Sequence, residues 1–245
     1  MMKNSSPPLS GGAVDRGVME DLAAASRILA DQGVFDSAGH VSMRHPRHAE
    51  RFLMSRSLAP ELVTANDIME FTLDCDACET RGRTGFIERF LHGEIYRTRA
   101  DVMAIAHGHS PSVIPFGLVD TPMRATYHNA AFLAAGVPVF DIRKAFGTTD
   151  IVISSGERGA ALAETLGDKS AVLLRAHGFA TVGPSLQAAV FRAFFTEVSA
   201  RVQLQTAALG GPMAVLDAGE GRMADAINLA THGRAWKLWK KRVTP

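Results

Sequence analysis

The chain has 245 residues, of which 47% are hydrophobic and 21% are charged, and its formal net charge is +1. This length and apolar content suffice for one globular domain with a complete core, which we place at residues 13–245. The nearly balanced charge gives no electrostatic reason to bind nucleic acid, and no apolar run is long enough to span a bilayer, so we expect a small-molecule substrate.

The N-terminal segment differs in composition from the rest. Residues 1–12 are polar and rich in Pro, Ser and Gly, which is typical of a disordered lead-in. Because they lack the apolar core of a signal peptide, we expect a cytoplasmic protein. Apolar residues then recur at helical spacing from Val14 to Gln32, and Gly33 supplies a stop. This pattern predicts an amphipathic first helix.

Short strands and helices alternate along the remaining chain. Apolar runs bounded by turn residues predict strands at 39–44, 51–54, 68–73, 102–109, 137–141 and 171–175. Helical spacing predicts a turn at 64–67 and helices at 90–97, at 159–166, directly after Ser110-Pro111, and from the capping Ser185 to Leu209. Strands that come early and helices that flank them are typical of a mixed α/β layered domain with a mainly antiparallel sheet.

The most specific chemical signal is the segment AHGHSP. His107 and His109 alternate at the end of the apolar run VMAIA, so both imidazoles point to the same face of the predicted strand. His177 ends a second apolar strand, directly before a glycine, and Glu88 lies just before a predicted helix. Three imidazoles that leave an open coordination position are typical of a catalytic metal site.

A structural role is the competing interpretation of these histidines. A single histidine on an apolar face is more often a hydrogen-bonded core residue than a ligand. The third imidazole and Glu88 favour the metal site, and strand ends are where α/β proteins hold ligands. Imidazole ligands favour Zn²⁺ or Mn²⁺ here, and Fe²⁺ or Co²⁺ remains compatible with them. The sequence therefore predicts a metal-dependent enzyme with one divalent ion per subunit.

The cysteine pair is a weaker signal. Cys75 and Cys78 form a CxxC, but the second half of a zinc ribbon is missing. Flanking acidic residues raise thiol pKa values, which works against reactivity. We expect this segment to be a solvated loop.

The C-terminal stretch RAWKLWKKRV alternates basic residues with Trp236 and Trp239. Such a stretch can contact a membrane surface or nucleic acid, but it is short. Packing between subunits is the simpler expectation.

Four segments identify a family resemblance: AGHVSMRHP, LVTANDIMEF, ERFLHGEIYRTRADVMAIAHGHSP and LLRAHGFATVGPSLQAAV. In this order and spacing, over about Ala24 to Gly210, the chain resembles the class II aldolase/adducin family. The resemblance implies a three-layer α/β/α class II aldolase-like domain with a mainly antiparallel central sheet. It also implies a homotetramer of four-fold symmetry with active sites between subunits.

The resemblance also implies roles for single residues. His107, His109 and His177 correspond to the metal ligands, and Glu88 corresponds to the catalytic acid/base. Aldolases of this family use a tyrosine from a neighbouring subunit as a proton donor. Tyr127 and His128 lie in the matching region, and the sequence does not decide between them.

Departures from the family pattern concern the substrate. Sugar-phosphate aldolases hold the phosphate with an Asn after Gly, a Thr-Gly pair and two serines before the glutamate. Here His40 replaces the Asn, Arg56 lies in the Thr-Gly region, and Phe86 and Ile87 replace the serines. A phosphate dianion needs several donors, so we do not expect a sugar phosphate. Phe86 and Ile87 instead form an apolar wall, while His40 and Arg56 can bind a carboxylate.

These features predict a carbon–carbon lyase. Our preferred hypothesis is decarboxylation of an aromatic or heteroaromatic hydroxy acid through a metal-stabilised, enolate-like carbanion, with Glu88 supplying the proton. The segments ERFLHGEIYR and HSPSVIPFG also resemble the family's hydroxy-pyridine dicarboxylate and dihydroxyphthalate decarboxylases.

Three alternatives remain at this point. A class II aldolase acting on an unphosphorylated hydroxy-keto acid needs the same metal and carboxylate. A non-catalytic, adducin-like interaction module is a second alternative, against which the retained histidines and Glu88 argue. Oxidative chemistry is a third, because three imidazoles can hold iron.

Overall fold

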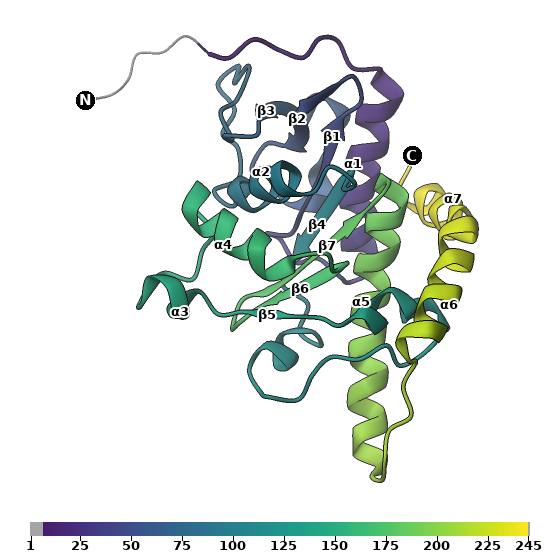
Figure 1. Ribbon diagram of the computed structural model, residues 1–245. Helices are drawn as coiled ribbons and strands as arrows, with labels where there is room; N and C mark the ends of the chain where they lie inside the picture. The colour runs from purple at the N-terminus through teal and green to yellow at the C-terminus, as the bar shows by residue number, and fades with distance from the viewer. Residues whose placement is uncertain (1–6, 245) are drawn as a thin grey trace.

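A seven-stranded sheet forms the centre of the molecule in the computed structural model, which describes residues 7–244 (Figure 1). The strand order is β3-β2-β1-β4-β7-β6-β5. Neighbouring strands are antiparallel except β5 and β6, which are parallel, so the expected mainly antiparallel sheet is confirmed. The strands are β1 (His40–His45), β2 (His48–Ser55), β3 (Ile68–Thr72), β4 (Ala104–Gly108), β5 (Val139–Phe140), β6 (Ala171–Leu174) and β7 (Gly178–Gly183).

Helices cover both faces of this sheet, with α1 and α5 on one face and α2 and α4 on the other (Figure 1). Each face has its own apolar cluster between sheet and helices. The α/β/α layering expected from the family resemblance is therefore confirmed. The helices are α1 (Arg16–Asp31), α2 (Arg89–Thr98), α3 (Ile142–Phe146), α4 (Gly156–Leu166), α5 (Leu186–Leu209), α6 (Ala218–Thr231) and α7 (Gly233–Val243).

Strand alternation decides which side chains reach the α2 face. On β4, Ala104 and Ala106 pack in the cluster beneath α1 and α5, whereas Ile105 packs in the cluster beneath α2 and α4. His107 therefore shares the α2 face with Ile105. In the antiparallel pair of β1 and β4, His40 lies directly opposite His107, so its side chain points to the same face.

The predicted elements agree closely with the observed ones near the site. The first helix spans Arg16–Asp31 with Asp15 as its N-cap, and Gly33 takes a φ of 69° just after its end. The last long helix is capped as expected, because the Ser185 side chain accepts a hydrogen bond from the Ala188 backbone N–H. Residues 7–12 of the predicted lead-in are described, and Ser10 and Gly11 donate hydrogen bonds to Glu70; residues 1–6 lie outside the described part.

The sequence predicts a helix directly after Ser110, and this prediction is wrong. A 3-10 helix at Ile114–Gly117 takes its place, and the Ser110 hydroxyl donates to buried Glu197. Pro115 explains the difference, since it lacks the N–H that an α-helix needs there and its ring collides with the preceding turn. The sequence interpretation also missed β7, α3, α6 and α7, and β7 begins directly after His177.

The cysteine pair does not lie in a solvated loop, so this expectation is corrected. Cys75 is 2% exposed and Cys78 is 8% exposed. Burial raises the pKa of Cys75 to about 12 and that of Cys78 to about 11. Burial, and not the flanking acidic residues, is therefore the main cause of their low reactivity.

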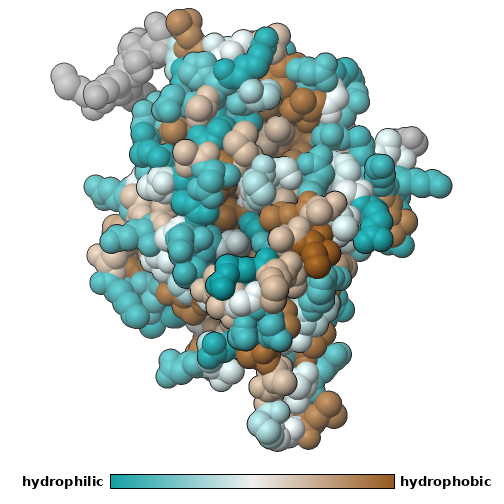
Figure 2. All heavy atoms as spheres, turned by 45° about the vertical axis from the view of Figure 1, so that its right-hand side comes forward, coloured by the Kyte–Doolittle hydropathy of each residue, from teal (hydrophilic) through white to brown (hydrophobic). Residues whose placement is uncertain are grey.

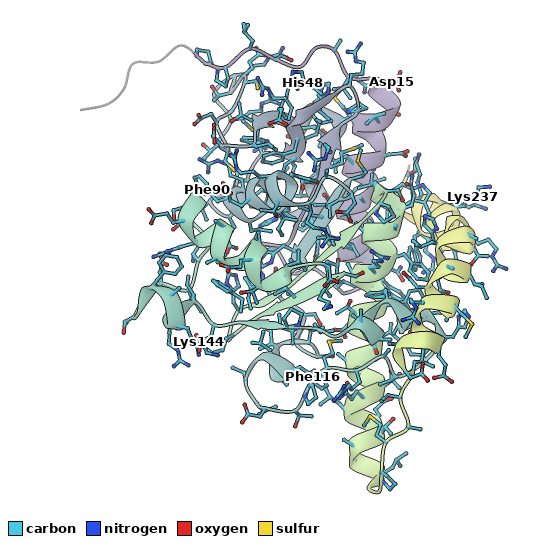
Figure 3. All side chains as sticks on the ribbon, in the orientation of Figure 1. Asp15, His48, Phe90, Phe116, Lys144 and Lys237 are labelled. Carbon is cyan, nitrogen blue, oxygen red and sulfur yellow. The ribbon has the colours of Figure 1, made fainter. Side chains whose placement is uncertain are left out.

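The C-terminal tryptophans pack within their own chain. Trp236 and Trp239 are buried, and the Trp239 ring centroid lies 4.8 Å from that of Phe194 on α5. The subunit contact expected for them is thus replaced by an intramolecular one. Lys237 points outward from α7 (Figure 3). Across residues 7–244, no helix combines the length and hydropathy that a membrane span requires.

Candidate metal centre

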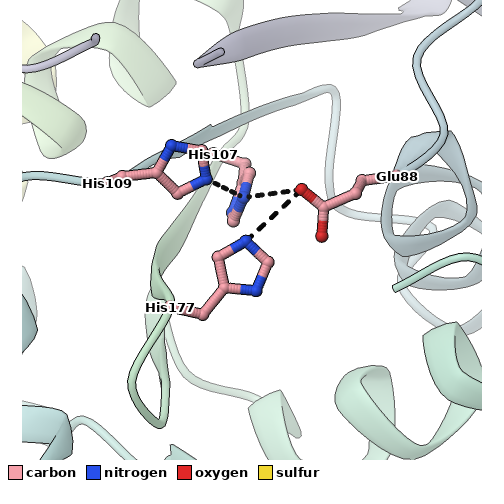
Figure 4. Close-up of side chains that lie close together, drawn as sticks. All are labelled: Glu88, His107, His109 and His177. Atoms are coloured by element: carbon pink, nitrogen blue, oxygen red, sulfur yellow. Dashed lines mark hydrogen bonds and ion pairs between the residues drawn. The ribbon is translucent and has the colours of Figure 1, made fainter. Parts of the chain in front are cut away.

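Three imidazoles and one carboxylate converge at one end of the sheet (Figure 4). His107 belongs to β4, His109 follows that strand, and His177 lies in the turn between β6 and β7. Glu88 is the N-cap residue of α2. One ligand atom from each of the four residues lies within 4.8 Å of the others. The structure therefore brings together the four residues that the sequence predicted as a metal centre.

The ligand atoms that face one another are the Nε2 atoms and one carboxylate oxygen. His107 Nε2 lies 3.2 Å from His109 Nε2. Glu88 Oε2 lies 3.4 Å from the Nε2 atoms of both His107 and His177. Nitrogen and oxygen donors this close to each other fit a divalent cation held among them.

Backbone carbonyls orient two of the imidazoles. His107 Nδ1 lies 3.0 Å from the Phe179 oxygen, and His177 Nδ1 lies 2.8 Å from the Ile151 oxygen. A carbonyl oxygen only accepts hydrogen bonds, so each Nδ1 carries the proton and donates it. Each Nε2 is then left with a lone pair that is available to a cation.

A carboxylate orients the third imidazole. His109 Nδ1 lies 3.1 Å from Asp36 Oδ1, and this carboxylate also accepts hydrogen bonds from the backbone N–H groups of Ala38 and Gly39. The sequence interpretation missed Asp36. Its only sequence signal is its position in FDSAGH, shortly before His40, and the fold is what brings it to His109.

The loop before α4 supports two ligands at once. Besides the Ile151 carbonyl that binds His177, the Ile153 N–H donates to Glu88 Oε1 at 3.1 Å. Ile151 has a φ of 58°, a conformation that strains a β-branched residue. This strained backbone is held in place at the site, where it orients one imidazole and leaves Glu88 Oε2 facing the other ligands.

Glycines beside the histidines allow the strand ends to approach closely. A Cβ added to Gly178 would collide with the Gly108 carbonyl oxygen, and a Cβ added to Gly108 would lie 2.6 Å from the Phe35 ring. Both positions therefore require glycine. The close approach brings His177 up to His107 and His109.

Glu88 is buried, with 8% of its surface exposed. Burial alone raises the pKa of this carboxyl, but the two imidazoles that face it, those of His107 and His177, outweigh burial and hold its pKa below its usual range. Glu88 is therefore a carboxylate among the imidazoles, as a metal ligand must be.

A cavity of about 570 Å³ adjoins this centre, and we call it the substrate cleft. Its lining includes His40, Ser57, Thr84, Phe86, Ile87 and Glu88. The His40 ring centroid lies 4.7 Å from that of Phe86 and 5.0 Å from that of His107. Burial lowers the pKa of His40 well below its ordinary value, so this ring is neutral.

Three other predicted site residues lie elsewhere in the chain. Arg56 Nε donates to Asp67 Oδ1 at 2.6 Å, and Arg56 does not line the substrate cleft. Tyr127 packs against Phe195, with 6.2 Å between ring centroids, and His128 is exposed. Within residues 7–244 of one chain, Tyr127 and His128 belong neither to the metal centre nor to the cleft lining.

Replacing Asp36 by Asn is expected to weaken metal binding by about tenfold, since second-shell partners of metal-bound histidines contribute about 10–100-fold to affinity. The amide still accepts from Ala38 and Gly39, so the substitution removes mainly the charge behind His109. Competition with a fluorescent zinc chelator measures the affinity. Asp31→Asn, at the end of α1, is the control; equal affinity in both variants would exclude this role.

The chain is similar to proteins with known activities. The sequence model described as Class II Aldolase and Adducin N-terminal domain matches residues 20–204. Decarboxylase tropJ of Talaromyces stipitatus is 33% identical over 242 residues, which cover 88% of this chain and 90% of that protein. The 3,4-dihydroxyphthalate decarboxylase of Arthrobacter keyseri is 28% identical, over 91% of this chain and 92% of the relative.

Solved structures share the fold. An L-fuculose 1-phosphate aldolase from Glaciozyma antarctica matches with a TM-score of 0.77 and 23% identity, over 97% of this chain and 93% of that one. This similarity extends through the sheet and both helical layers. The match of the family model over residues 20–204 shows that the chain belongs to the class II aldolase and adducin N-terminal domain family.

Proposed function

We propose that this protein is a divalent-metal-dependent carbon–carbon lyase that decarboxylates an aromatic or heteroaromatic hydroxy acid. The observation that carries the proposal is the intact cluster of Glu88 and three imidazoles beside a cleft lined by Phe86. The two relatives described above are named as decarboxylases, and one of them takes its name from a dihydroxy aromatic acid.

His107, His109 and His177 would hold the metal through their Nε2 atoms, and Glu88 would complete the set when no substrate is bound. Zn²⁺ and Mn²⁺ are the ions we propose, since both accept imidazole and carboxylate ligands. A bound divalent cation supplies charge stabilisation for an electron-rich oxygen of the substrate.

The chain's own residues account for the remaining steps. The bond between the ring carbon and the carboxylate carbon breaks, carbon dioxide leaves, and the electron pair stays on the ring carbon. Glu88, after taking up a proton from solvent water, delivers it to this carbon, which restores the neutral ring. Phe86 packs against the ring face, and His40 lies within the cleft to contact a polar substituent.

The lining of the cleft argues against a phosphorylated substrate. Phe86 and Ile87 directly precede Glu88 and carry no hydrogen-bond donor in their side chains. Arg56, the one guanidinium expected nearby, is bound to Asp67. A phosphate dianion placed against these two side chains would lose hydration there without gaining a partner from either of them.

Incubating the zinc- or manganese-loaded protein with a panel of ortho-hydroxy aromatic acids and hydroxy-keto acids tests the proposal. Carbon dioxide release with the hydroxy aromatic acids, followed by mass spectrometry of the product, is the expected result. Aldehyde release from a hydroxy-keto acid would instead identify an aldolase. No turnover of any compound by a protein that binds metal would contradict the lyase assignment.

Changing Phe86 and Ile87 together to serine is expected to lower kcat/KM for the aromatic acid by about tenfold or more. The double substitution removes two large apolar side chains from the cleft lining, and burying one such side chain contributes about 1.5–3 kcal/mol. Steady-state kinetics measure the effect. Leu118→Ser, at an exposed apolar position outside the cleft, is the control. Unchanged kinetics in the double variant would remove the apolar wall from the proposal.

We also propose that the protein is a homotetramer, as its family resemblance implies. Figure 2 shows apolar side chains exposed at the lower tip of the molecule, where α5 ends. Leu209 is 86% exposed there. In a tetramer, Tyr127 or His128 would approach a neighbouring subunit's centre. Light scattering is expected to give about four times the 26.2 kDa mass of the chain, and a monomer would contradict this assembly.

A further inference from the structure

A chain of four buried polar side chains leads from the core to the substrate cleft. Tyr96 OH lies 2.8 Å from Ser42 Oγ, which lies 2.6 Å from His92 Nδ1. His92 Nε2 in turn lies 2.8 Å from His40 Nδ1. All four residues are at most 2% exposed. The opposite end of the chain, His40 Nε2, is buried and has no hydrogen-bond partner among the described residues.

The spacing of residues on β1 and α2 explains how these four side chains come to lie in one line. His40 and Ser42 are two residues apart on β1, so they share one face of the strand. His92 and Tyr96 are four residues apart on α2, so they share one face of the helix. The two residues of α2 and the two of β1 alternate along one continuous hydrogen-bonded line, in the order Tyr96, Ser42, His92 and His40.

The two hydroxyl hydrogens determine the direction of this line. If Tyr96 donates to Ser42, Ser42 to His92 and His92 to His40, both hydroxyl hydrogens have an acceptor. In the reverse direction Ser42 donates to Tyr96, and the Tyr96 hydrogen has no acceptor among residues 7–244. If Ser42 accepts from both neighbours, its own hydrogen is left without a partner. The first direction leaves one buried atom without a partner, the His40 Nε2–H, whereas each alternative leaves two, one hydroxyl hydrogen and the lone pair of His40 Nε2. Because every buried polar atom without a partner is costly, the first direction is favoured.

We infer that Tyr96, Ser42 and His92 are positioning residues that fix His40, in the wall of the substrate cleft, as the tautomer with its hydrogen on Nε2. In this tautomer His40 is a hydrogen-bond donor toward the cleft and has no lone pair there. On the proposed function, from which this role follows, His40 binds an acceptor oxygen of the substrate, either carboxylate or phenolate. His40 is not the base of the reaction.

The rings next to His40 show where its N–H donor lies relative to the metal centre and the apolar wall. Its ring lies between His107 of the metal centre and the Phe86 ring of the apolar wall. A planar hydroxy acid that stacks on Phe86 and reaches the metal centre with one oxygen would present a second oxygen to His40 Nε2. The line thus selects for substrates with two adjacent acceptor oxygens and against those that present an ammonium group, which cannot accept a hydrogen bond, at this point.

NMR of isotopically labelled histidine nitrogens in the zinc-loaded full chain tests the tautomer directly, and it needs no substrate. The two ring nitrogens have distinct shifts according to which one carries the hydrogen, and His40→Gln assigns the signals by their loss. The expected result is a protonated Nε2 and an unprotonated Nδ1 for His40. A His40 with its hydrogen on Nδ1 would overturn the inference, whatever the protein turns over.

A double substitution tests the positioning role. Ser42→Ala with Tyr96→Phe removes both hydroxyls, after which the two directions leave equal numbers of unpartnered atoms. The NMR spectrum is expected to change from one His40 tautomer to a mixture, and apparent substrate affinity is expected to fall by about twofold as the competent fraction halves. Thr196→Val, which removes a buried hydroxyl on α5, is the control and keeps one tautomer. A single unchanged tautomer in the double variant would show that the hydroxyls do not set it.

Kinetics of His40 variants separate this inference from the proposed function. His40→Gln keeps an N–H donor near the position of Nε2, whereas His40→Leu keeps only the volume. We expect the leucine variant to lose about tenfold or more in kcat/KM, the size of one hydrogen bond to a charged group, and the glutamine variant to regain most of it. Equal losses in both variants would contradict the donor role. Absence of decarboxylation in the unsubstituted protein would instead contradict the proposed function and leave the NMR result standing.

Discussion

Turnover by the Glu88→Gln variant is expected to fall by about 10³-fold, within the range of about 10²–10⁴ that a positioned proton donor contributes. Glutamine has the size of glutamate and can keep the hydrogen bond from the Ile153 N–H, but it cannot deliver a proton to carbon. The three imidazoles remain, so the variant is expected to retain its metal. Carbon dioxide release and elemental analysis of the purified protein measure the two quantities independently.

A matched control for this variant lies on the same helix. Glu94 on α2 pairs with the half-exposed Arg97 at 3.3 Å, outside the metal centre. Ion pairs of this kind contribute little, so Glu94→Gln is expected to turn over like the unsubstituted protein. If Glu88→Gln were fully active with its metal bound, Glu88 would have no part in the proton transfer.

Metal affinity is expected to fall by about 10²–10³-fold in the His177→Ala variant. Zinc sites with four ligands contribute about 10–16 kcal/mol, so one ligand corresponds to about 3–4 kcal/mol. Because His177 lies in a turn at the edge of the site and is partly exposed, its loss is expected to leave the fold intact. Calorimetric titration with zinc measures the affinity, and circular dichroism reports on the fold.

His48→Ala is the corresponding control for non-specific binding to histidine. His48 is exposed at the start of β2, and it lies outside the cluster of four ligands. This variant is expected to bind one zinc ion per chain with unchanged affinity. Equal affinities in His177→Ala and His48→Ala would place the metal somewhere other than the predicted centre.

The convergence of Glu88 with the three histidines could be predicted from the sequence, because the position of each residue depends on a local pattern. The period of two along β4 places His107 and His109 on one face, and the glycine after His177 marks the end of a strand. Glu88 directly precedes a helix with clear spacing, and the structure confirms it as the N-cap. The spacing of residues within single strands and helices thus identifies the four side chains that converge.

The surroundings of the centre could not be predicted, because they depend on contacts between distant segments. The pairing of β1 with β4 places His40 opposite His107, and no local pattern encodes this register. The same applies to Asp36, whose side chain reaches His109 only after the loop before β1 folds over β4. Arg56 illustrates the converse, since a guanidinium expected in the site is bound by Asp67 instead.

Misplaced elements have equally physical causes. The capping signal at Ser110 and Pro111 is genuine, but Pro115 prevents the helix from continuing. The C-terminal tryptophans were expected to reach another subunit, because the packing of α7 on α1 and α5 was not foreseen. At Ser110 the capping pattern was interpreted correctly, but Pro115 prevents an α-helix. In the C-terminal stretch the tryptophans were expected to be buried between subunits, but contacts within the chain bury them.

The histidines of the candidate metal centre and the apolar residues of the cleft come from different segments of the chain. The imidazoles lie on β4, just beyond it and in the β6–β7 turn, where Gly108 and Gly178 leave no room for a larger side chain. Phe86 and Ile87, by contrast, lie in the loop that leads into α2, and Ile87 is 59% exposed. On the proposed function, substitutions in this short loop would change substrate preference while the three imidazoles stay in place, so positions 86 and 87 would be the first targets for directed evolution toward new acids.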